Sequence, residues 1–197
     1  MSLVVYSSSR ELSVDDARAV PRSSMRTCWN GSALPQPLSW SVALDPRALW
    51  FVCELPGGRV CTSQKSHGQF LEGLWDEDVA ELFIKGENGA YQEFNLAPSG
   101  AWWSMTLSEY RKRRTDSKRP EPLHISTTIG SDRWEVVAAF GRDTLEIPLL
   151  PSSRIHVSGM WCRPEPCYLS SHPPSGVAPD YHHSACFQAV SLVACAS

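Results

Sequence analysis

The stretch VAELFIKGENGAYQEFNL, residues 79–96, decides the fold of this chain. Its two ends are rich in β-branched and aromatic residues, and between them lies a turn of glycine and asparagine. Such segments predict a β-hairpin whose strands are Val79–Lys85 and Tyr91–Leu96. Because successive strand residues point to opposite faces of a sheet, the register of the two strands determines which side chains are neighbours.

A loop over residues 86–90 places Glu81 opposite Asn95 and Phe83 opposite Glu93. In this register the apolar side chains share one face and the polar ones share the other: Leu82, Ile84 and Phe94 against Glu81, Glu93 and Asn95. A shift of one residue would place an apolar side chain beside a carboxylate, so burial of one face selects this register. The sequence predicts a sheet with one apolar face and one face that carries a cluster of carboxylates and an amide.

Short segments of the same kind recur along the chain between Pro- and Gly-rich breaks. They predict further strands at 49–55, 101–107, 123–129, 133–140, 155–161 and 187–195. Helical periodicity is faint, at Val14–Ala19 and around 141–145. We expect an all-β fold, an antiparallel and jelly-roll-like β-sandwich, in one domain over residues 1–197. Residues 1–25 are expected to be an N-terminal wrapping segment and the Pro-rich residues 162–180 a loop.

Composition excludes several classes of function. The chain has 197 residues, with 18 Lys and Arg against 21 Asp and Glu, and a net charge of −3. This balance predicts neither nucleic acid nor an anionic membrane as partner. No apolar run approaches the roughly 18–20 residues that span a bilayer. The first residues are too short a hydrophobic run for a secretory signal, which favours the cytoplasm unless a leader has been removed. The oligomeric state stays open.

Tryptophan and cysteine are unusually frequent, with 8 and 7 residues. The tryptophans indicate either a β-rich core or a flat platform for a ligand. An odd number of cysteines does not fit a complete disulfide framework. We therefore expect most of the thiols to be reduced, buried and inert.

Four segments together resemble the family 9 carbohydrate-binding modules and their DOMON-like relatives. Gly73–Ile84 has a Trp, acidic residues and a V-E-L/I-F strand, and Tyr91–Gly100 has the pattern Y-x-E/Q-F-x-x-x-P-x-G. Trp134–Phe140 is similar to the W-x-V-E-V-A-I strand of the family, and Asp180–Phe187 to its closing aromatic segment. The matches occur in the family's order and span about residues 45–195.

The resemblance implies a non-catalytic domain that binds sugar. In sugar-binding members, two aromatic rings enclose a terminal pyranose while a nearby Glu and amides bond its hydroxyls. Carried over by motif, the rings are Trp75 and Tyr181 and the carboxylate is Glu81. Glu93 and Asn95, on the same polar face, supply further hydrogen bonds.

The sequence also departs from the family pattern. His183 and Ser184 stand where sugar binders often have Asp-Pro, and Gln188 replaces a glycine. Trp102 and Trp103 occupy the place where an arginine usually follows the second strand. Since adjacent strand residues face opposite ways, one of the two tryptophans should join the core and the other the ligand platform. The calcium ligands of some members have no match.

A metal site is the main alternative. Thiolate and imidazole are suitable zinc ligands, and the chain carries five such residues between positions 162 and 186. The candidate ligands are Cys162, Cys167, His182, His183 and Cys186. Their spacing fits no standard zinc motif, and two prolines interrupt the first pair, which could instead form a Cys162–Cys167 disulfide in an oxidising compartment.

Three further alternatives are less favoured: a haem site, a loop that binds a polyanion, and a structural domain without a sugar ligand. Some DOMON relatives bind haem b, for which Met105, Met160 and His156 are the candidate ligands. The basic run at 111–114, with Lys118 and Arg119, could bind a polyanion, although such runs are usually solvated loops. No nucleophile, metalloprotease or phosphate-loop motif is present, so we expect no enzyme. The fold could also persist as a structural domain without a sugar ligand.

Overall fold

The computed structural model describes residues 2–57, 67–162, 165–176 and 178–195. Strands dominate this part of the chain, and the hairpin at 79–96 is present with the predicted bounds. The strands are β1 Ser2–Ser7, β2 Ser23–Thr27, β3 Ala33–Leu44, β4 Ala48–Pro56, β5 Val79–Lys85, β6 Tyr91–Leu96, β7 Trp102–Glu109, β8 Lys112–Arg113, β9 Pro122–Ile129, β10 Arg133–Gly141, β11 Arg154–Trp161, β12 Cys167–Ser170 and β13 Gln188–Ala194. The helical elements are α1 Val14–Ala19 and the short 3₁₀ turns η1 Leu74–Asp76, η2 Arg142–Thr144 and η3 Ser184–Cys186.

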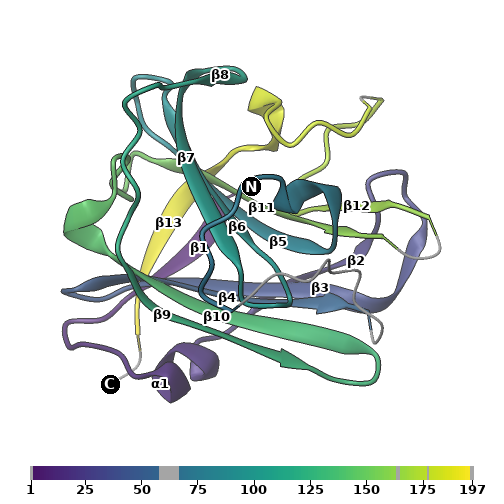
Figure 1. The fold of residues 1–197 in the computed structure, drawn as a ribbon, viewed down its shortest axis with the longest axis horizontal. Helices are drawn as coiled ribbons and strands as arrows, with labels where there is room; N and C mark the ends of the chain where they lie inside the picture. The colour runs from purple at the N-terminus through teal and green to yellow at the C-terminus, as the bar shows by residue number, and fades with distance from the viewer. Residues whose placement is uncertain (1, 58–66, 163–164, 177, 196–197) are drawn as a thin grey trace.

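The strands form two layers that cross in Figure 1, as expected for a β-sandwich. The first sheet has the order β8-β7-β6-β5-β11-β13, and the second has the order β3-β4-β10-β9. β12 pairs with β11, and β2 pairs with β3. β1 lies between β13 and β3 and connects the two sheets through hydrogen bonds.

The predicted register of the hairpin is confirmed. Glu81 pairs with Asn95 and Phe83 with Glu93. Leu82, Ile84 and Phe94 therefore face inward into the core between the sheets. Across that core, the ring of Phe94 lies 4.9 Å from the ring of Phe140 on β10. The opposite, polar face of the hairpin points away from the second sheet.

The fold also corrects three expectations. Residues 1–25 are not merely a wrapping segment, since they contain β1, α1 and the start of β2. The sandwich is not wholly antiparallel, because β1 runs parallel to both of its neighbours. Residues 2–7 form a strand because Leu3 and Val5 alternate into the core. The loop expected at 162–180 contains β12, while its residues 163–164 and 177, including the Pro164 of the first cysteine pair, lie outside the described residues.

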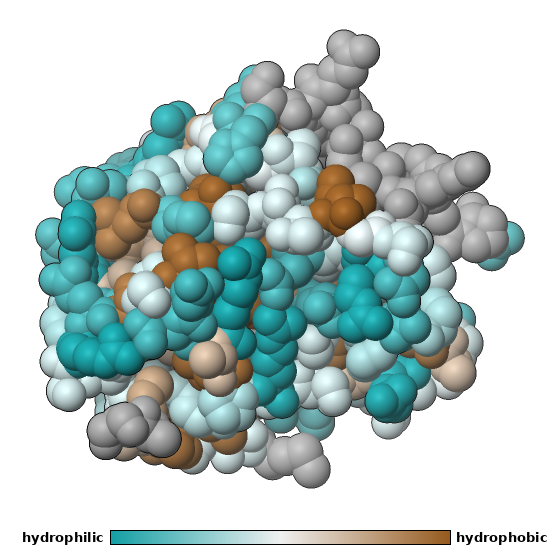
Figure 2. Space-filling view, turned by 90° about the horizontal axis from the view of Figure 1, so that it is seen from below, coloured by the Kyte–Doolittle hydropathy of each residue, from teal (hydrophilic) through white to brown (hydrophobic). Residues whose placement is uncertain are grey.

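The outer face of the second sheet is closed. Helix α1, predicted at Val14–Ala19 and capped by Ser13, packs Ala17 against this face, in a cluster that includes Trp50. Beside it, Glu135 on β10 forms ion pairs with Arg18 and Arg22. Figure 2, viewed from below Figure 1, shows hydrophobic residues scattered among hydrophilic ones on this side. The outer face of the first sheet, by contrast, carries a cavity.

Within the described ranges, no helix is long and apolar enough to cross a membrane.

Candidate functional site

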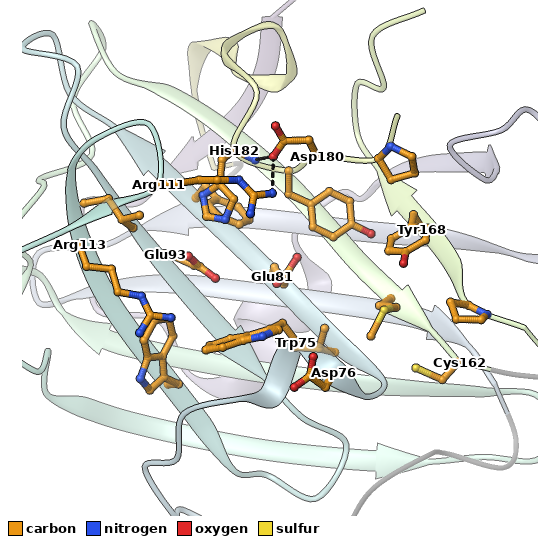
Figure 3. Close-up of a pocket in the computed structure, with 18 residues that line it drawn as sticks. Trp75, Asp76, Glu81, Glu93, Arg111, Arg113, Cys162, Tyr168, Asp180 and His182 are labelled. Atoms are coloured by element: carbon orange, nitrogen blue, oxygen red, sulfur yellow. Dashed lines mark hydrogen bonds and ion pairs between the residues drawn. The ribbon is translucent and has the colours of Figure 1, made fainter. Parts of the chain in front are cut away.

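A cavity of about 560 Å³ opens on the outer face of the first sheet. Strands β5, β6, β7 and β11 contribute its floor. Its walls come from η1, from β8 and the turn before it, from residues 179–182 before η3, and from Cys162, Pro166 and Tyr168 between the end of β11 and the start of β12. In Figure 3, Glu81 and Glu93 lie between Trp75 on one side and Arg111, Asp180 and His182 on the other. The polar face predicted for the hairpin is therefore the floor of a concave site.

Two carboxyl groups form the centre of the floor. Glu81 and Glu93 are only 2% and 6% exposed, yet both line the cavity. Ser158 Oγ donates a hydrogen bond of 2.8 Å to Glu81 Oε2. Asn95 Nδ2 donates one of 2.7 Å to Glu93 Oε1. Each carboxyl group is thus fixed from the protein side while it borders the cavity.

Burial raises the pKa of both groups. Desolvation is the main cause for Glu81, and the nearby charge of Glu93 raises its pKa further. For Glu93, desolvation again dominates, while the hydrogen bond from Asn95 and the positive charges of Arg113 and Arg111 act in the opposite direction. The two neighbouring carboxyls consequently retain protons at a pH where exposed glutamates have lost them.

This pair makes a contribution to stability that depends on pH. The folded state binds protons at these two carboxyls more tightly than the unfolded chain does. The stability that the pair contributes therefore falls as the pH rises from about 4.3, the ordinary glutamate pKa. The fall continues up to about 8, the pKa to which burial raises Glu81. We expect the wild type to lose more stability than a Glu81→Gln variant between pH 5 and pH 8.5. Thermal unfolding at both pH values measures this, and parallel pH profiles of the two proteins would contradict it.

Two tryptophans form an aromatic wall. Trp75 belongs to η1, which begins after Gly73 in a left-handed conformation with φ of 87°. Its ring centroid lies 5.2 Å from that of Trp103 on β7, in an edge-to-face arrangement. The Arg113 guanidinium lies 5.4 Å from the centroid of each ring and also pairs with Glu72. The rings are held in place by contacts that leave both of them in the cavity lining.

The opposite wall is a hydrogen-bonded network. Asp180 accepts bonds from Arg111 Nη2 at 2.9 Å and from Tyr110 Oη at 2.8 Å. Tyr91 Oη lies 2.9 Å from Nδ1 of His182 and accepts a bond from the backbone N–H of Arg111. Burial lowers the pKa of His182 to about 4, helped by the charge of Arg111, so this imidazole is neutral at pH 7. The network ties the loop around β8 to the segment before η3.

Tyr181 presents its ring to the cavity, while its hydroxyl is fully engaged. The hydroxyl donates to the carbonyl of Gly159 at 2.5 Å and accepts from the N–H of Leu169 at 3.1 Å. Burial raises the pKa of this phenol well above its usual value. The hydroxyl therefore anchors Tyr181 to β11 and β12, and the ring is the part that can contact a ligand.

The structure brings most of the predicted ligand residues together. Five of them line the cavity: Trp75, Glu81, Glu93, Trp103 and Tyr181. Trp102 does not, because it lies on the core face, with its ring 5.4 Å from that of Phe140. Asn95 is fully buried beneath the floor and supports Glu93. The expectation that one of the two adjacent tryptophans joins the core is confirmed, and that residue is Trp102.

Five residues of the site have no sugar-binding role in the expectations from sequence, which give His182 as a zinc ligand and the arginines as part of a basic run. The five are Asp76, Arg111, Arg113, Asp180 and His182. The family's arginine was sought directly after β6 and not found there, but Arg111 and Arg113 reach the cavity from the loop after β7. The signal for them is the basic run at 111–114, for which the sequence predicts a solvated loop or a polyanion site.

The proposed zinc set is wrong as assembled. Cys167 forms a disulfide with Cys28, with the Cα atoms 6.1 Å apart, so its thiolate is unavailable and a Cys162–Cys167 disulfide is excluded. His182 bonds to Tyr91, and the buried Cys186 bonds to the carbonyl of Asp180. No group of three or more metal-ligating side chains gathers within the described ranges. Of the two remaining candidates, His183 accepts a bond from the N–H of Ala185, and Cys162 lines the cavity beside the apolar cluster of Trp103.

Among the described residues, Cys162 and Cys195 are free thiols that are only partly buried, so the expectation of burial fails for them. The expectation of inert thiols holds for Cys53 and Cys186, since burial raises the pKa of both. It is wrong for Cys28 and Cys167, which are joined.

The candidate haem ligands are engaged elsewhere. His156 is buried, with Nδ1 near the carbonyl of Tyr181 and Nε2 near Ser170 Oγ. Burial lowers its pKa to about 3. Met160 and Met105 pack in the apolar cluster around Trp103. These contacts are those of packed core residues.

No protein-family profile matches the chain. No curated protein matches it either. Several solved structures match the chain. A protein of Bacteroides uniformis ATCC 8492 that is proposed to bind carbohydrate is 12% identical, with a TM-score of 0.75, over 98% of this chain and 100% of its own.

Two solved structures of family 9 carbohydrate-binding modules from Caldicellulosiruptor kristjanssonii, one with glucose and one with cellotriose, also match. The glucose complex is 11% identical with a TM-score of 0.62, over 98% of this chain and 97% of its own. The cellotriose complex is 12% identical with a TM-score of 0.59, over 98% and 95%. At this identity the likeness concerns the fold. The chain therefore has a β-sandwich fold similar to that of the family 9 carbohydrate-binding modules, as the sequence resemblance predicts.

Proposed function

We propose that this protein binds carbohydrate, without catalysis, in the cavity on the first sheet. The observation that carries the proposal is the pair of buried carboxyls, Glu81 and Glu93, at the floor of a cavity walled by tryptophan and tyrosine rings. The neighbours with the same fold include modules solved with glucose and cellotriose.

The chemistry of the cavity suits a sugar. A pyranose has apolar C–H faces, which pack on flat rings such as Trp75 and Tyr181. Its hydroxyls both donate and accept hydrogen bonds; a protonated carboxyl can do the same, and an ionised one is the stronger acceptor. A volume of about 560 Å³ falls within the usual range for small-molecule sites, roughly 300–1,000 Å³. Arg111 and Arg113 add donors at the rim for hydroxyl or ring oxygens.

The placement of the carboxyls favours binding over hydrolysis. Glycosidases use two carboxyl groups that flank the scissile bond from opposite sides. Here Glu81 and Glu93 lie on adjacent strands, β5 and β6, and both face the cavity from its floor. They can therefore approach a ligand only from one side.

The test is a calorimetric titration with a panel of sugars that begins with glucose and cellotriose. A Trp75→Ala variant is expected to bind about 20-fold more weakly, because it removes one of the stacking rings. Ile129→Ala is the matched control, since Ile129 is an exposed apolar residue on β9 of the second sheet. Equal affinity of the Trp75→Ala variant and the wild type would refute the cavity as the site, as would no binding of any sugar by the wild type.

A further inference from the structure

We infer that the cavity is one end of a longer site, and that its ligand is an oligosaccharide whose next unit occupies a second hollow beside it. This inference rests on the proposed function. The second hollow has a volume of about 500 Å³ and lies between the turn that connects β2 to β3 and the segment that leads into β12.

The two hollows are contiguous. Pro166, Tyr168 and Pro179 line both of them. Tyr168 is 38% exposed, and its ring centroid lies 6.3 Å from that of Tyr181. The ring of Tyr181 forms part of the wall of the first cavity. In Figure 3, Tyr168 lies on the side of the cavity away from Arg113. In the inferred arrangement, the ligand extends from the cavity past Tyr168 into the second hollow.

The lining of the second hollow has the chemistry of a sugar subsite. Trp29 and Trp161 provide flat rings in addition to Tyr168. Asn30 and Glu165 are exposed polar residues at its edge. Rings with polar groups around them suit a pyranose that stays partly in solvent. The buried carboxyls of the first cavity, in contrast, suit the unit that is most enclosed.

The second hollow is built rigidly. The disulfide between Cys28 and Cys167 joins the β2–β3 turn to the start of β12. Next to it, the N–H of Trp29 donates a hydrogen bond of 2.7 Å to the carbonyl of Tyr168. Two wall residues from distant parts of the sequence are thus held side by side before any ligand arrives. Such preorganisation reduces the entropy lost on binding.

The experiment compares matched monosaccharides and trisaccharides by calorimetry. The pairs are glucose with cellotriose, xylose with xylotriose, and N-acetylglucosamine with chitotriose. For the pair that binds, the wild type is expected to bind the trisaccharide about tenfold more tightly than the monosaccharide. In Trp161→Ala, which alters only the second hollow, the ratio of the two Kd values should fall close to one. Asn30→Ala should lower the ratio in the same direction by a smaller amount, which guards against a folding defect in the first variant.

Three results would count against the inference. Equal affinity of the wild type for both members of a pair would overturn the inference and leave the proposed function intact. The same holds if Trp161→Ala loses affinity equally for both members while its melting temperature is unchanged. No binding of any probe to the wild type would overturn the proposed function, and the inference with it. Trp75→Ala serves as the contrast, because it should weaken the monosaccharide and the trisaccharide alike.

Discussion

At pH 9, where both carboxyls are ionised, replacing Glu81 and Glu93 together by glutamine is expected to weaken sugar binding about 100-fold. A hydrogen bond to a charged acceptor contributes about 1.5–3 kcal/mol, and each 1.4 kcal/mol corresponds to a factor of ten in affinity. Glutamine keeps the shape of the floor but removes its charge. Calorimetric titration with the sugar that the wild type binds measures the effect.

The same double variant should be more stable than the wild type above pH 7. Both carboxyls are almost completely buried, so ionising them in the folded state is costly. Opposite changes in affinity and melting temperature would show that the pair is kept for binding. Glu87→Gln is the control, because Glu87 is exposed in the turn of the same hairpin. Full affinity in the double variant would rule out the carboxyls as ligand contacts.

Removing the disulfide by Cys28→Ser with Cys167→Ser should lower the free energy of unfolding by about 4 kcal/mol. The two cysteines are 139 positions apart, so their bond closes a very long loop of the unfolded chain. Cross-links over loops of this length restrict the unfolded ensemble most strongly in the chain-entropy description, and native disulfides contribute roughly 2–5 kcal/mol. Urea unfolding of the oxidised proteins measures the difference.

Cys195→Ser provides the comparison for that experiment, since Cys195 is a half-buried thiol at the end of β13. It should leave the urea midpoint close to that of the wild type. Reduction of the wild type should reproduce the effect of the double serine variant. An unchanged midpoint after reduction would show that the bond adds nothing to stability.

The hairpin could be predicted from sequence because its information is local. Alternating residues in β5 and β6, a turn of glycine and asparagine, and the need to bury one face together define both strands and their register. β3 gave no such signal, since Pro35 and Pro37 interrupt its first half and only the residues from Leu38 onward are mostly buried. The parallel pairing of β1 with β13 has no local signature at all, because its partners come from distant parts of the sequence.

The candidate site divides in the same way. Trp75 and Glu81 lie within one segment and could be located from it. The roles of the two adjacent tryptophans follow from pairing: Trp103 is opposite Asn95 and shares its outer face, whereas Trp102 is opposite Leu96 and shares its inner one. Extending the predicted register from β6 to the next strand, β7, determines which of the two tryptophans faces the core.

How deeply a side chain is buried, and which distant segments meet, could not be predicted from the sequence. Asn95 faces the correct side of the sheet, yet it is fully buried, and strand alternation carries no information on that. Arg111 and His182 meet through the hydroxyl of Tyr91, three residues that belong to separate segments. Only the folded chain brings them to one wall.

The position of β1 also affects the time course of folding. Its edge toward β13 pairs Ser2 with Ala189 and Ser7 with Ala194, contacts that span almost the whole described sequence. On a ribosome, this edge of β1 stays without its partner until β13 has been synthesised. Contacts between such distant residues slow folding, because the closure of a long loop must precede them. The junction between the two sheets is therefore completed late, and until then β1 and β13 both expose strand edges that can pair with other chains.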